Sequence, residues 1–340
     1  MSFTFVARHH VRELRKYYRL YEIDELAFHC RDVFSKPVCL IHPYFFVVQR
    51  HPQQFFNNLH KFKAIIGIDV ADTDQLGRVA VQLANMATAF ITHSTFAREV
   101  YVKSGVKVPV YVVPHGLDRK FFTAPKTPTD PYLKKLLDFK RKRNAIYVLF
   151  FLWHSGERKG VDLVYKVMSE IQRTWSNVYL VCKCGSLAGH DVRLLQSLRG
   201  FVFSRWLDDH NLVALYDMCE IYTLFSRGGG FELNGLEALA RGLVVLAGSK
   251  GSWVDYLPDF CLIKKVHRVR FWSDTDPINS IHCGCGYEVD IDEAVDKLHD
   301  VLNNLDDYRA RIRDYFEKVK QKYTWESVGM KLKEVVDKYL

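Results

Sequence analysis

The sequence predicts an α/β protein with two doubly wound, Rossmann-like domains that face a central cleft. Three observations predict this fold. A chain of 340 residues is long enough for two domains of ordinary size. In both halves, short apolar runs alternate with helical patterns, which is typical of parallel sheets covered by helices on both faces. Between the halves lies a charged stretch with three prolines, residues 123–144, of the kind that separates domains.

The first predicted domain covers residues 1–130. Its apolar runs indicate buried strands over Val38–Ile41, Ala64–Ile68, Ala89–Thr92 and Val110–Val113. Helices are expected between these runs, over Gln75–Met86 and Ser94–Ser104. Ser94 is a suitable N-cap for the second helix, and Gly105 is a suitable stop.

Residues 1–35 predict one or two basic, aromatic helices. Leu14, Tyr17 and Tyr21 recur at helical spacing, with arginines between them. Such a helix could pack one stripe on the core, or it could lie on an anionic membrane surface. Both interpretations stay open.

The second predicted domain covers residues 145–318, after a basic linker over residues 131–144. Its expected strands are Ala145–Leu152, Asn177–Val181, Gly200–Phe203, Ile221–Leu224 and Leu243–Leu246. Its expected helices are Val161–Trp175, His190–Ser197, Asp208–Met218 and one that contains Gly235–Ala240. Residues 264–288 have no clear period, and Asp292–Leu340 reads as helical.

The charge is unevenly distributed along the chain. Residues 1–144 hold 23 Lys/Arg and 12 Asp/Glu, a net charge of +11, whereas residues 145–340 hold 25 and 27, a net charge of −2. A basic first half predicts an anionic partner: nucleic acid, anionic lipid or a phosphorylated substrate. The basic residues are scattered rather than gathered in a recognisable motif, which argues against nucleic acid.

Two features of the sequence bear on its location in the cell. The longest apolar stretch, Ala145–Trp153, is too short to span a membrane, and the N-terminus has no apolar signal-peptide core. We therefore expect a cytoplasmic protein, with peripheral contact to the inner membrane face as an option.

The eight cysteines include two Cys-x-Cys pairs, Cys182/Cys184 and Cys283/Cys285, the second preceded by His282. Residues i and i+2 of a strand share a face, so each pair can point into one core. A zinc site and a disulfide are the alternatives. Structural zinc sites usually have two or more residues between paired cysteines. We expect reduced core cysteines and no metal.

Two segments predict an anion-binding site. Ser155–Leu163 follows a strong apolar strand and opens a helix, so free backbone N–H groups would accompany Arg158 and Lys159. Ser226–Gly242 carries three successive glycines before another helix, so its backbone can approach a ligand closely. A diphosphate would suit both. Glu237, in the first turn of the second helix, could accept hydrogen bonds from ribose hydroxyls or could complement the helix dipole.

Four segments together resemble the family 4 glycosyltransferases of the GT-B type. These are VYVVPHGLDRKFF (110–122), WHSGERKGVDL (153–163), LFSRGGGFELNGLEALARGLVVLAG (224–248) and YTWESVGMKLKEVVDKYL (323–340). The resemblance implies the GT-B architecture, a nucleotide-sugar donor, UDP- or GDP-linked, bound by the second domain, and retention of anomeric configuration. It also implies that the terminal helix, residues 319–340, crosses back to the first domain.

The resemblance also implies roles for particular residues. Lys159 matches the lysine that binds the donor diphosphate, and Glu237 matches the ribose-binding glutamate. The residues that match the loop facing phosphate and sugar are Gly230, Phe231, Leu233 and Asn234. Ser204, Arg205 and Trp206 fall where similar proteins hold the base. Ser155 and Gly156 belong to the diphosphate loop.

This sequence departs from the family pattern at three places. The first 60 residues lack the Gly-Gly loop that is common in the family. The first glutamate of the family, eight residues before the second, is Gly229 here, and Glu232 stands three residues later as a replacement candidate. The family's arginine would fall at Trp153 or His154, so Arg158 is the candidate substitute.

The predicted reaction needs stabilisation of a departing diphosphate. Cations and N–H dipoles preorganised for that charge are stronger in the transition state, so no metal or other cofactor is obligatory. Besides Lys159 and Glu232, Asp72 and His115 are the catalytic candidates. Asp69 and His42 follow predicted strands of the first domain and are expected on the acceptor side. The acceptor, a glycan, lipid or protein, is open.

Two alternatives remain. A nucleotide-sugar epimerase or a phosphorylase could use the same scaffold, because fold does not fix chemistry. A basic nucleic-acid-binding protein is the alternative from a different class.

Overall fold

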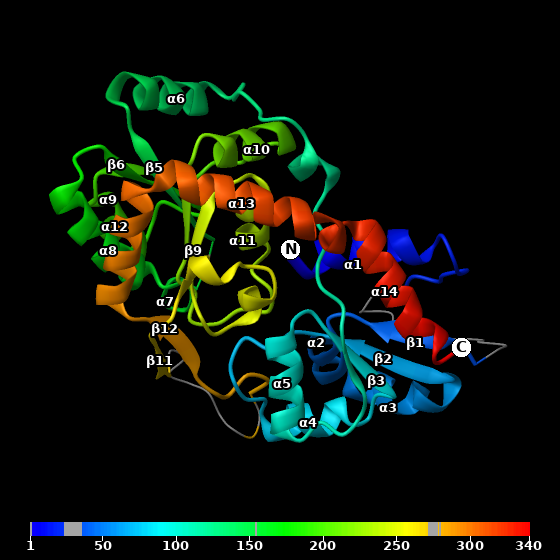
Figure 1. Ribbon diagram of the computed structural model, residues 1–340. Coiled ribbons are helices and arrows are strands. Elements are labelled where there is room, and N and C mark those ends of the chain that lie inside the picture. The colour runs from blue at the N-terminus through cyan, green and yellow to red at the C-terminus, as the bar shows by residue number, and fades with distance from the viewer. Residues whose placement is uncertain (1, 24–35, 154, 271–277, 279) are drawn as a thin grey trace. The chain divides into compact units, whose positions relative to one another are not determined.

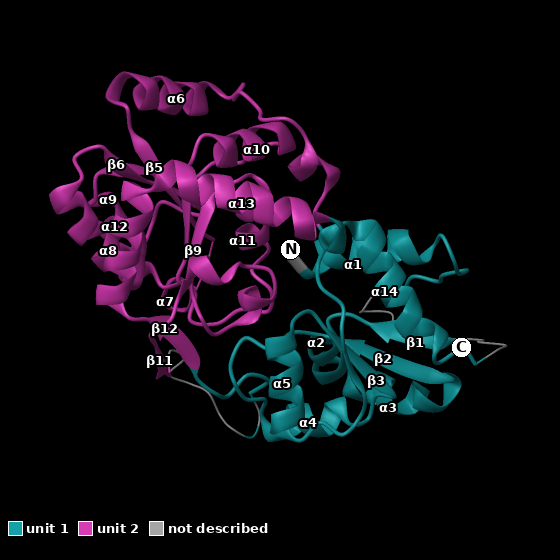
Figure 2. Ribbon diagram, viewed as in Figure 1, with its two compact units in different colours: residues 1–116, 273–285, 321–340 teal, residues 117–272, 286–320 magenta. Residues whose placement is uncertain are grey.

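The computed structural model describes residues 2–23, 36–153, 155–270, 278 and 280–340. The chain divides into two compact units (Figure 2). Unit 1 contains residues 1–116, 273–285 and 321–340, and unit 2 contains residues 117–272 and 286–320. Each unit has a parallel sheet with helices around it, which confirms the predicted α/β class with two Rossmann-like domains.

The sheet of unit 1 has the order β1-β2-β3-β4, with every neighbouring pair parallel (Figure 1). Its strands are β1 (Val38–Ile41), β2 (Ala64–Ile68), β3 (Ala89–Thr92) and β4 (Val110–Val112). The first three have the predicted bounds and the fourth is one residue shorter. Strands that are covered on both faces consist of continuous runs of β-branched and apolar residues. These runs were enough to predict the positions of the strands from the sequence.

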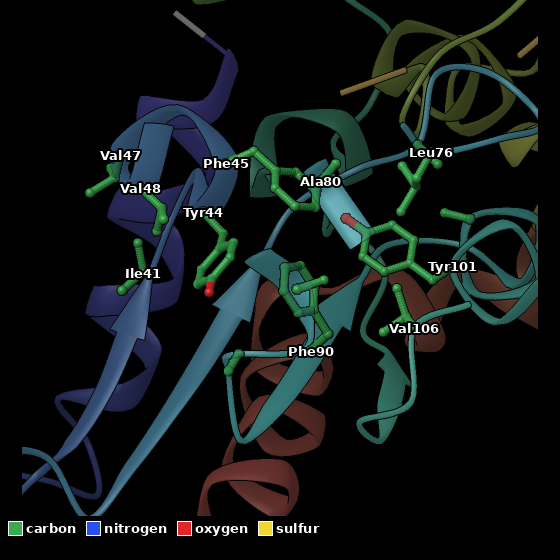
Figure 3. Close-up of a cluster of buried hydrophobic side chains, with 14 of the residues drawn as sticks. Ile41, Tyr44, Phe45, Val47, Val48, Leu76, Ala80, Phe90, Tyr101 and Val106 are labelled. Carbon is green, nitrogen blue, oxygen red and sulfur yellow. The ribbon is translucent and has the colours of Figure 1, made fainter. Parts of the chain in front are cut away.

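One face of this sheet packs on an aromatic cluster (Figure 3). The Phe90 ring lies 4.9 Å from the Tyr44 ring and 5.0 Å from the Tyr101 ring, measured between ring centroids. The helices on this side are α2 (Tyr44–Arg50), α3 (Pro52–Asn58), α4 (Arg78–Ala84) and α5 (Thr95–Ser104). Ser94 caps α5 by accepting the Ala97 N–H, and Gly105 ends it with φ of 105°, so both predicted signals of this helix are confirmed.

The opposite face of the sheet is covered by the two ends of the chain. Side chains alternate along a strand, so Ile66, Ile68 and Ile91 point to this side. There they pack with α1 (Ser2–Leu14) and α14 (Trp325–Asp337). The helical reading of Leu14–Tyr21 is wrong, because α1 lies upstream and ends at Leu14. The rest of the predicted 1–35 helix falls largely on residues 24–35, outside the described residues.

Helix α4 begins at Arg78, three residues later than expected. Residues before it form hydrogen bonds to the segment 278–285 of the same unit, so their N–H groups are not available to a helix. Examples are Asp74 N to Cys285 O at 2.9 Å and Gly77 N to Ile281 O at 3.0 Å.

The described strands of unit 2 form a parallel sheet of order β10-β9-β8-β5-β6-β7, and a separate antiparallel pair. The strands are β5 (Ile146–Leu152), β6 (Val178–Cys184), β7 (Gly200–Phe203), β8 (Ile221–Leu224), β9 (Val244–Gly248), β10 (Leu262–Ile263), β11 (Val266–Val269) and β12 (Gly286–Val289). The helices are α6 (Pro131–Arg143), α7 (Gly156–Lys159), α8 (Val161–Thr174), α9 (His190–Gln196), α10 (Asp209–Asp217), α11 (Leu233–Ala240), α12 (Ile291–Asn303) and α13 (Leu305–Val319). All five predicted strands of this half are present.

The expected linker over residues 131–144 is helix α6 and belongs to unit 2, which begins at Leu117. Asp130 caps the helix by accepting the N–H groups of Tyr132 and Leu133, and Pro131 occupies the first turn. The basic cluster at residues 140–143 forms its last turn, where cations favour the helix dipole. Pro131 therefore marks the start of a helix.

The predicted helical tract Asp292–Leu340 is three helices, with a break between α13 and α14. Thr324 caps α14 by accepting the Ser327 N–H at 3.1 Å. Unit 2 ends at Lys320, and α14 belongs to unit 1.

The two cysteine pairs have different surroundings. Cys182 and Cys184 lie on β6 with both side chains buried, as expected for positions that share a face. Cys283 and Cys285 precede β12 and lie outside the strands. Each cysteine of the described ranges is a free thiol, and Cys30 lies outside those ranges. None of the described helices has the length and apolar content needed to cross a bilayer.

Two positions on α14 provide a stability test. Leu332 is fully buried against the sheet of unit 1, whereas Met330 is 52% exposed. We expect Leu332→Ala to lower the free energy of unfolding by about 2–5 kcal/mol, because it removes methyl groups and leaves a cavity. The matched change Met330→Ala should alter it by about 0.5 kcal/mol or less. Denaturant unfolding followed by circular dichroism measures both, and equal effects would contradict the packing of α14 on this sheet.

Candidate active site

The first predicted diphosphate loop connects β5 to α8. Ser155 has a left-handed backbone, with φ of 57°, and begins the short helix α7. Arg158 and Lys159 form the last turn of α7, with most of both side chains shielded from solvent. The loop is tied to the second predicted segment, because Arg227 N donates to Arg158 O at 2.8 Å.

The second segment leads from β8 into α11. Glu232 stands immediately before α11 with φ of 59°, a left-handed conformation rare for a residue with a side chain. Two hydrogen bonds hold this backbone in place: Tyr256 Oη donates to Glu232 O at 2.8 Å, and Ser252 Oγ donates to Gly229 O at 2.7 Å. The left-handed turn directs the Glu232 side chain back over the glycines.

Glu232 brings the two segments together through its carboxylate. Lys159 Nζ lies 2.5 Å from Oε2, and Arg158 Nη1 lies 3.4 Å from Oε1. Arg158 Nη1 also donates to Gly228 O at 2.8 Å. Two cations therefore meet one anion next to the first turn of α11, where the helix dipole also favours negative charge. This arrangement can hold an anionic group.

Gly229 lacks a side chain where Glu232 needs room. A Cβ atom at Gly229 would lie 2.1 Å from Glu232 Oε1. The carboxylate of Glu232 thus fills the space beside Gly229, the position at which the family pattern has its first glutamate.

Glu237 lies in α11 and accepts a 2.6 Å hydrogen bond from Tyr216 Oη. Burial raises the pKa of its carboxyl group from 4.5 to about 7, although the Tyr216 hydrogen bond acts in the opposite direction. Asn234 Nδ2 donates to the same tyrosine oxygen at 3.3 Å. Lys159 and Glu237 therefore belong to the same unit, one paired with the residue before α11 and the other within α11.

Arg227 is a site residue that the sequence analysis missed. Its side chain is buried, and its guanidinium contacts both oxygens of Asp162 at 2.8 Å, Glu288 Oε2 at 2.8 Å and Glu157 O at 2.6 Å. It holds the diphosphate loop, the start of α8 and β12 in one arrangement. The available signal was an arginine shortly after a buried strand and immediately before the three glycines.

The residues expected near the nucleotide base do not meet at one point in this way. Arg205 pairs with Asp130 at 3.0 Å, and Trp206 is 80% exposed. A small cavity of about 160 Å³ lies instead at the ends of β5 and β6. Ser155 and Gly156 line it together with Leu152, Trp153, Ser186, Ala188, Gly189, His190, Asp191 and Val192. Of the two positions for the family's arginine, Trp153 carries no cation and His154 lies outside the described residues.

Phe231 and Leu233 flank Glu232, with Phe231 buried, its ring 5.3 Å from the Tyr256 ring. Gly230 completes the loop between Gly229 and these residues.

In unit 1, Asp69 follows β2 and is buried. It accepts the N–H groups of Phe45 at 2.9 Å and Val70 at 2.8 Å, but burial is the larger effect and raises its pKa to about 7. Asp72 lies three residues further on, half-buried, and its N–H is 3.4 Å from His282 Nδ1.

His42 and His115 belong to a larger group of imidazoles, which we call the histidine cluster: His9 and His10 of α1, His42 after β1, His93 after β3 and His115 after β4. All of them are buried except His42, which is partly exposed. The His93 ring lies 4.1 Å from His115, 6.1 Å from His42 and 6.2 Å from His10. The sequence analysis did not find His9, His10 or His93, because their proximity depends on the packing of α1.

Burial keeps four of these imidazoles uncharged, those of His10, His42, His93 and His115. It lowers the pKa of His42 to about 3 and of His93 to about 4, and it lowers the pKa values of His10 and His115 well below 6.5, with neighbouring histidines adding to the last two. Within the described ranges, no set of three His, Cys, Asp or Glu side chains is arranged to hold a metal ion.

Comparisons with known proteins bear on the family and the fold of the chain. The model of the family described as Glycosyl transferases group 1 matches residues 145–260, which contain both diphosphate-loop segments. A protein of the Sulfolobus islandicus filamentous virus (isolate Iceland/Hveragerdi), named "Putative glycosyltransferase 45", is 28% identical over 259 residues, which are 74% of this chain and 67% of that protein. The chain is a GT-B glycosyltransferase.

This glycosyltransferase belongs to one family with uncharacterized protein 356 of Sulfolobus islandicus rod-shaped virus 1. The two are 33% identical over 349 residues, which cover 100% of this chain and 96% of the relative.

Solved structures share its fold. A Staphylococcus aureus TarM mutant, in complex with fondaparinux, α-GlcNAc-glycerol and UDP, has a TM-score of 0.62 at 15% identity. The match covers 96% of the glycosyltransferase but 58% of TarM. An α,α-trehalose-phosphate synthase (UDP-forming) from Burkholderia xenovorans, in complex with glucose-6-phosphate, has a TM-score of 0.65 at 12% identity, with 98% and 77% of the two chains covered.

The histidine cluster predicts acid sensitivity of unit 1. Below pH 6.5 the unfolded chain binds protons on His10, His42, His93 and His115. In the folded unit the pKa values of these four histidines are lowered, to about 3 for His42 and about 4 for His93. The stabilisation that they contribute is therefore full above pH 6.5 and is lost as the pH falls. Asp69 has the opposite sign, because its pKa is raised in the folded state. As the pH falls, four histidines lose their stabilising contribution and one carboxyl group gains one. We therefore expect a net loss of stability of unit 1 from pH 6.5 to 4.

Hydrogen exchange of unit 1 amides across this pH range, corrected for intrinsic rates, measures the loss. His10→Phe should reduce the pH dependence by about one proton, whereas His190→Phe, on α9 of unit 2, should leave it unchanged. A flat profile in the wild-type protein would contradict the burial of the histidine cluster.

Proposed function

We propose that the protein is a family 4 enzyme that transfers a sugar from a UDP- or GDP-linked donor to an acceptor, with retention of anomeric configuration. The observation that carries the proposal is the meeting of Lys159, Arg158 and the start of α11 at one carboxylate, that of Glu232. Cations that meet at a helix N-terminus bind phosphate well.

The donor diphosphate would bind at these two cations. When the anomeric C–O bond breaks, negative charge grows on the leaving diphosphate. Cations already in position stabilise that charge more in the transition state than in the ground state. Lysine, arginine and helix dipoles can supply this stabilisation, so the proposal includes no obligatory metal or other cofactor.

Glu232 would act on the donor sugar. Its carboxylate occupies the space over Gly229 and lies between the cations and the glycine loop. Bound diphosphate would share Lys159 and Arg158 with it. The loop residues Gly230, Phe231, Leu233 and Asn234 would then face phosphate and sugar, and Glu237 would accept hydrogen bonds from ribose hydroxyls.

The nucleotide is best supported as UDP. The TarM structure was determined with UDP, and the trehalose-phosphate synthase is described as UDP-forming. Both proteins share the fold at low sequence identity, so GDP remains part of the proposal. Base contacts from Arg205 and Trp206 would require these exposed side chains to change partners.

The acceptor would bind to unit 1. Asp72 and His115 are the proposed catalytic residues on that side, with Asp69 and His42 close to the carboxyl ends of β2 and β1. Uncharged imidazoles can accept a proton from an acceptor hydroxyl. The acceptor class, a glycan, lipid or protein, is left open.

Membrane contact is also a proposal. Arg8, Arg12 and Arg15 are exposed on α1 or just after it, and Tyr21 is 73% exposed. A basic and aromatic surface of this kind favours anionic lipid. We propose a cytoplasmic enzyme that meets the inner membrane face in this way.

Lys159→Ala tests the diphosphate site. The melting temperature with UDP, GDP or ADP should rise in the wild-type protein, because a ligand that binds only the folded state stabilises it. The variant should bind the same nucleotide about 10- to 100-fold more weakly, since one charge-assisted hydrogen bond is lost. Lys166→Ala, on the exposed side of α8, is the control. A variant that binds like wild type would remove Lys159 from the site.

Glu232→Gln tests whether this carboxylate competes with the diphosphate. The change keeps the size of the side chain and removes the negative charge near Lys159. Nucleoside diphosphate binding should become about 3- to 10-fold tighter, while sugar turnover falls. Isothermal titration and turnover with a UDP-sugar measure the two effects. Weaker binding in this variant would show that Glu232 supports the phosphate rather than competing with it.

A further inference from the structure

The chain changes units within a short segment, residues 280–288, which we call the connecting segment. Its first part, through Cys285, belongs to unit 1, and its second part begins β12 of unit 2. The sequence analysis found no period here and assigned no role to His282 or to the cysteine pair. The contacts that the connecting segment forms within each unit suggest a role for it.

In unit 1, the connecting segment holds the loop that follows β2, which contains Asp72. Asp74 N donates to Cys285 O at 2.9 Å, and Cys285 N donates to Asp74 Oδ1 at 2.8 Å. Gly77 N donates to Ile281 O at 3.0 Å, and Cys283 N donates to Gln75 O at 3.1 Å. The loop 72–77 thus owes its conformation to this segment, because it has no regular secondary structure of its own beyond an isolated bridge at Leu76.

Gly284 shows how closely the segment and the loop approach. A Cβ atom at Gly284 would lie 2.3 Å from Asp74 Oδ1 and 2.7 Å from Gln75 N. A methyl group at this position would therefore displace the connecting segment from the loop.

In unit 2, the connecting segment contacts Arg227. Tyr287 N donates to Arg227 O at 2.8 Å, and Glu288 Oε2 accepts from Arg227 Nε at 2.9 Å. Arg227 N in turn donates to Arg158 O. A residue of the proposed diphosphate site is therefore two hydrogen bonds away from Tyr287, and Tyr287 is two residues along the chain from Cys285.

We propose that the connecting segment is a positioning element, through which a diphosphate bound at Arg158 and Lys159 orders the Asp72 loop. The inference rests on the proposed function, since it needs the donor site. An anion that fixes Arg158 restrains Arg227 and the start of β12. The connecting segment then loses less conformational freedom when it docks on the loop, so docking becomes more favourable.

Three amides report the docking directly. The N–H groups of Asp74, Gly77 and Val79 donate to carbonyl groups of Cys285, Ile281 and Ile278. Hydrogen exchange of a peptide covering residues 72–79 should slow about threefold or more when UDP or GDP is added at saturation to the wild-type protein. The melting temperature, measured in parallel, shows independently whether the nucleotide binds.

Two variants disturb the connecting segment, one at its contacts in unit 1 and one at its contacts in unit 2. Gly284→Ala removes the fit in unit 1, and Glu288→Ala removes the side-chain contact to Arg227 in unit 2. Both should lose the nucleotide-induced slowing of exchange at residues 72–79. Gly284→Ala, which alters no contact of the proposed donor site, should also keep the nucleotide-induced rise in melting temperature. Glu288→Gln should retain part of the response, because its amide oxygen still accepts from Arg227. Asp296→Asn, on the exposed face of α12, is the matched control and should respond like wild type.

The outcomes are distinguishable. If the melting temperature rises but exchange at residues 72–79 is unchanged, or if both variants keep the full response, the positioning role is wrong and the donor site stands. If neither nucleotide raises the melting temperature, the proposed function fails and this inference fails with it.

Discussion

The buried guanidinium of Arg227 constrains the donor half of this protein. A charge removed from water must find partners within hydrogen-bond distance, or the fold loses several kcal/mol. Asp162 and Glu288 supply carboxylates, and the carbonyl of Glu157 completes the set. These contacts hold the predicted diphosphate loop against the glycine segment. As a result, Lys159 lies beside Glu232. The arrangement of the candidate donor site follows from one buried arginine that is itself no predicted ligand.

Unit 1 meets the problem of buried polar groups differently. Four imidazoles of its histidine cluster stay in the fold without charge, because burial lowers their pKa values and keeps them deprotonated near neutral pH. Neutral rings cost far less to bury than ions, and they retain the ability to take up a proton. The buried polar groups of the two units therefore differ: cations paired with carboxylates in unit 2, and neutral imidazoles in unit 1.

The sheets could be predicted from sequence because their strands are continuous apolar runs, and such runs are rare outside buried strands. The role of the loop after β5 as a diphosphate loop stays a prediction, drawn from the two basic residues that follow the strand. Other features depend on contacts between distant residues. The position of the Glu232 carboxylate depends on a left-handed backbone held by Tyr256. Residues 131–143 form a helix that Asp130 caps, although the three prolines of residues 123–144 indicated a linker. The clustering of His10 with His93 depends on the packing of α1.

Both ends of the chain complete the same sheet face, and this has a consequence for biosynthesis. Ile66, Ile68 and Ile91 are covered by α1 and by α14, and α14 is synthesised more than two hundred residues after these isoleucines. While the ribosome makes the residues in between, this apolar face lacks the cover that α14 provides. Unit 1 therefore closes only after all of the residues of unit 2 have been synthesised.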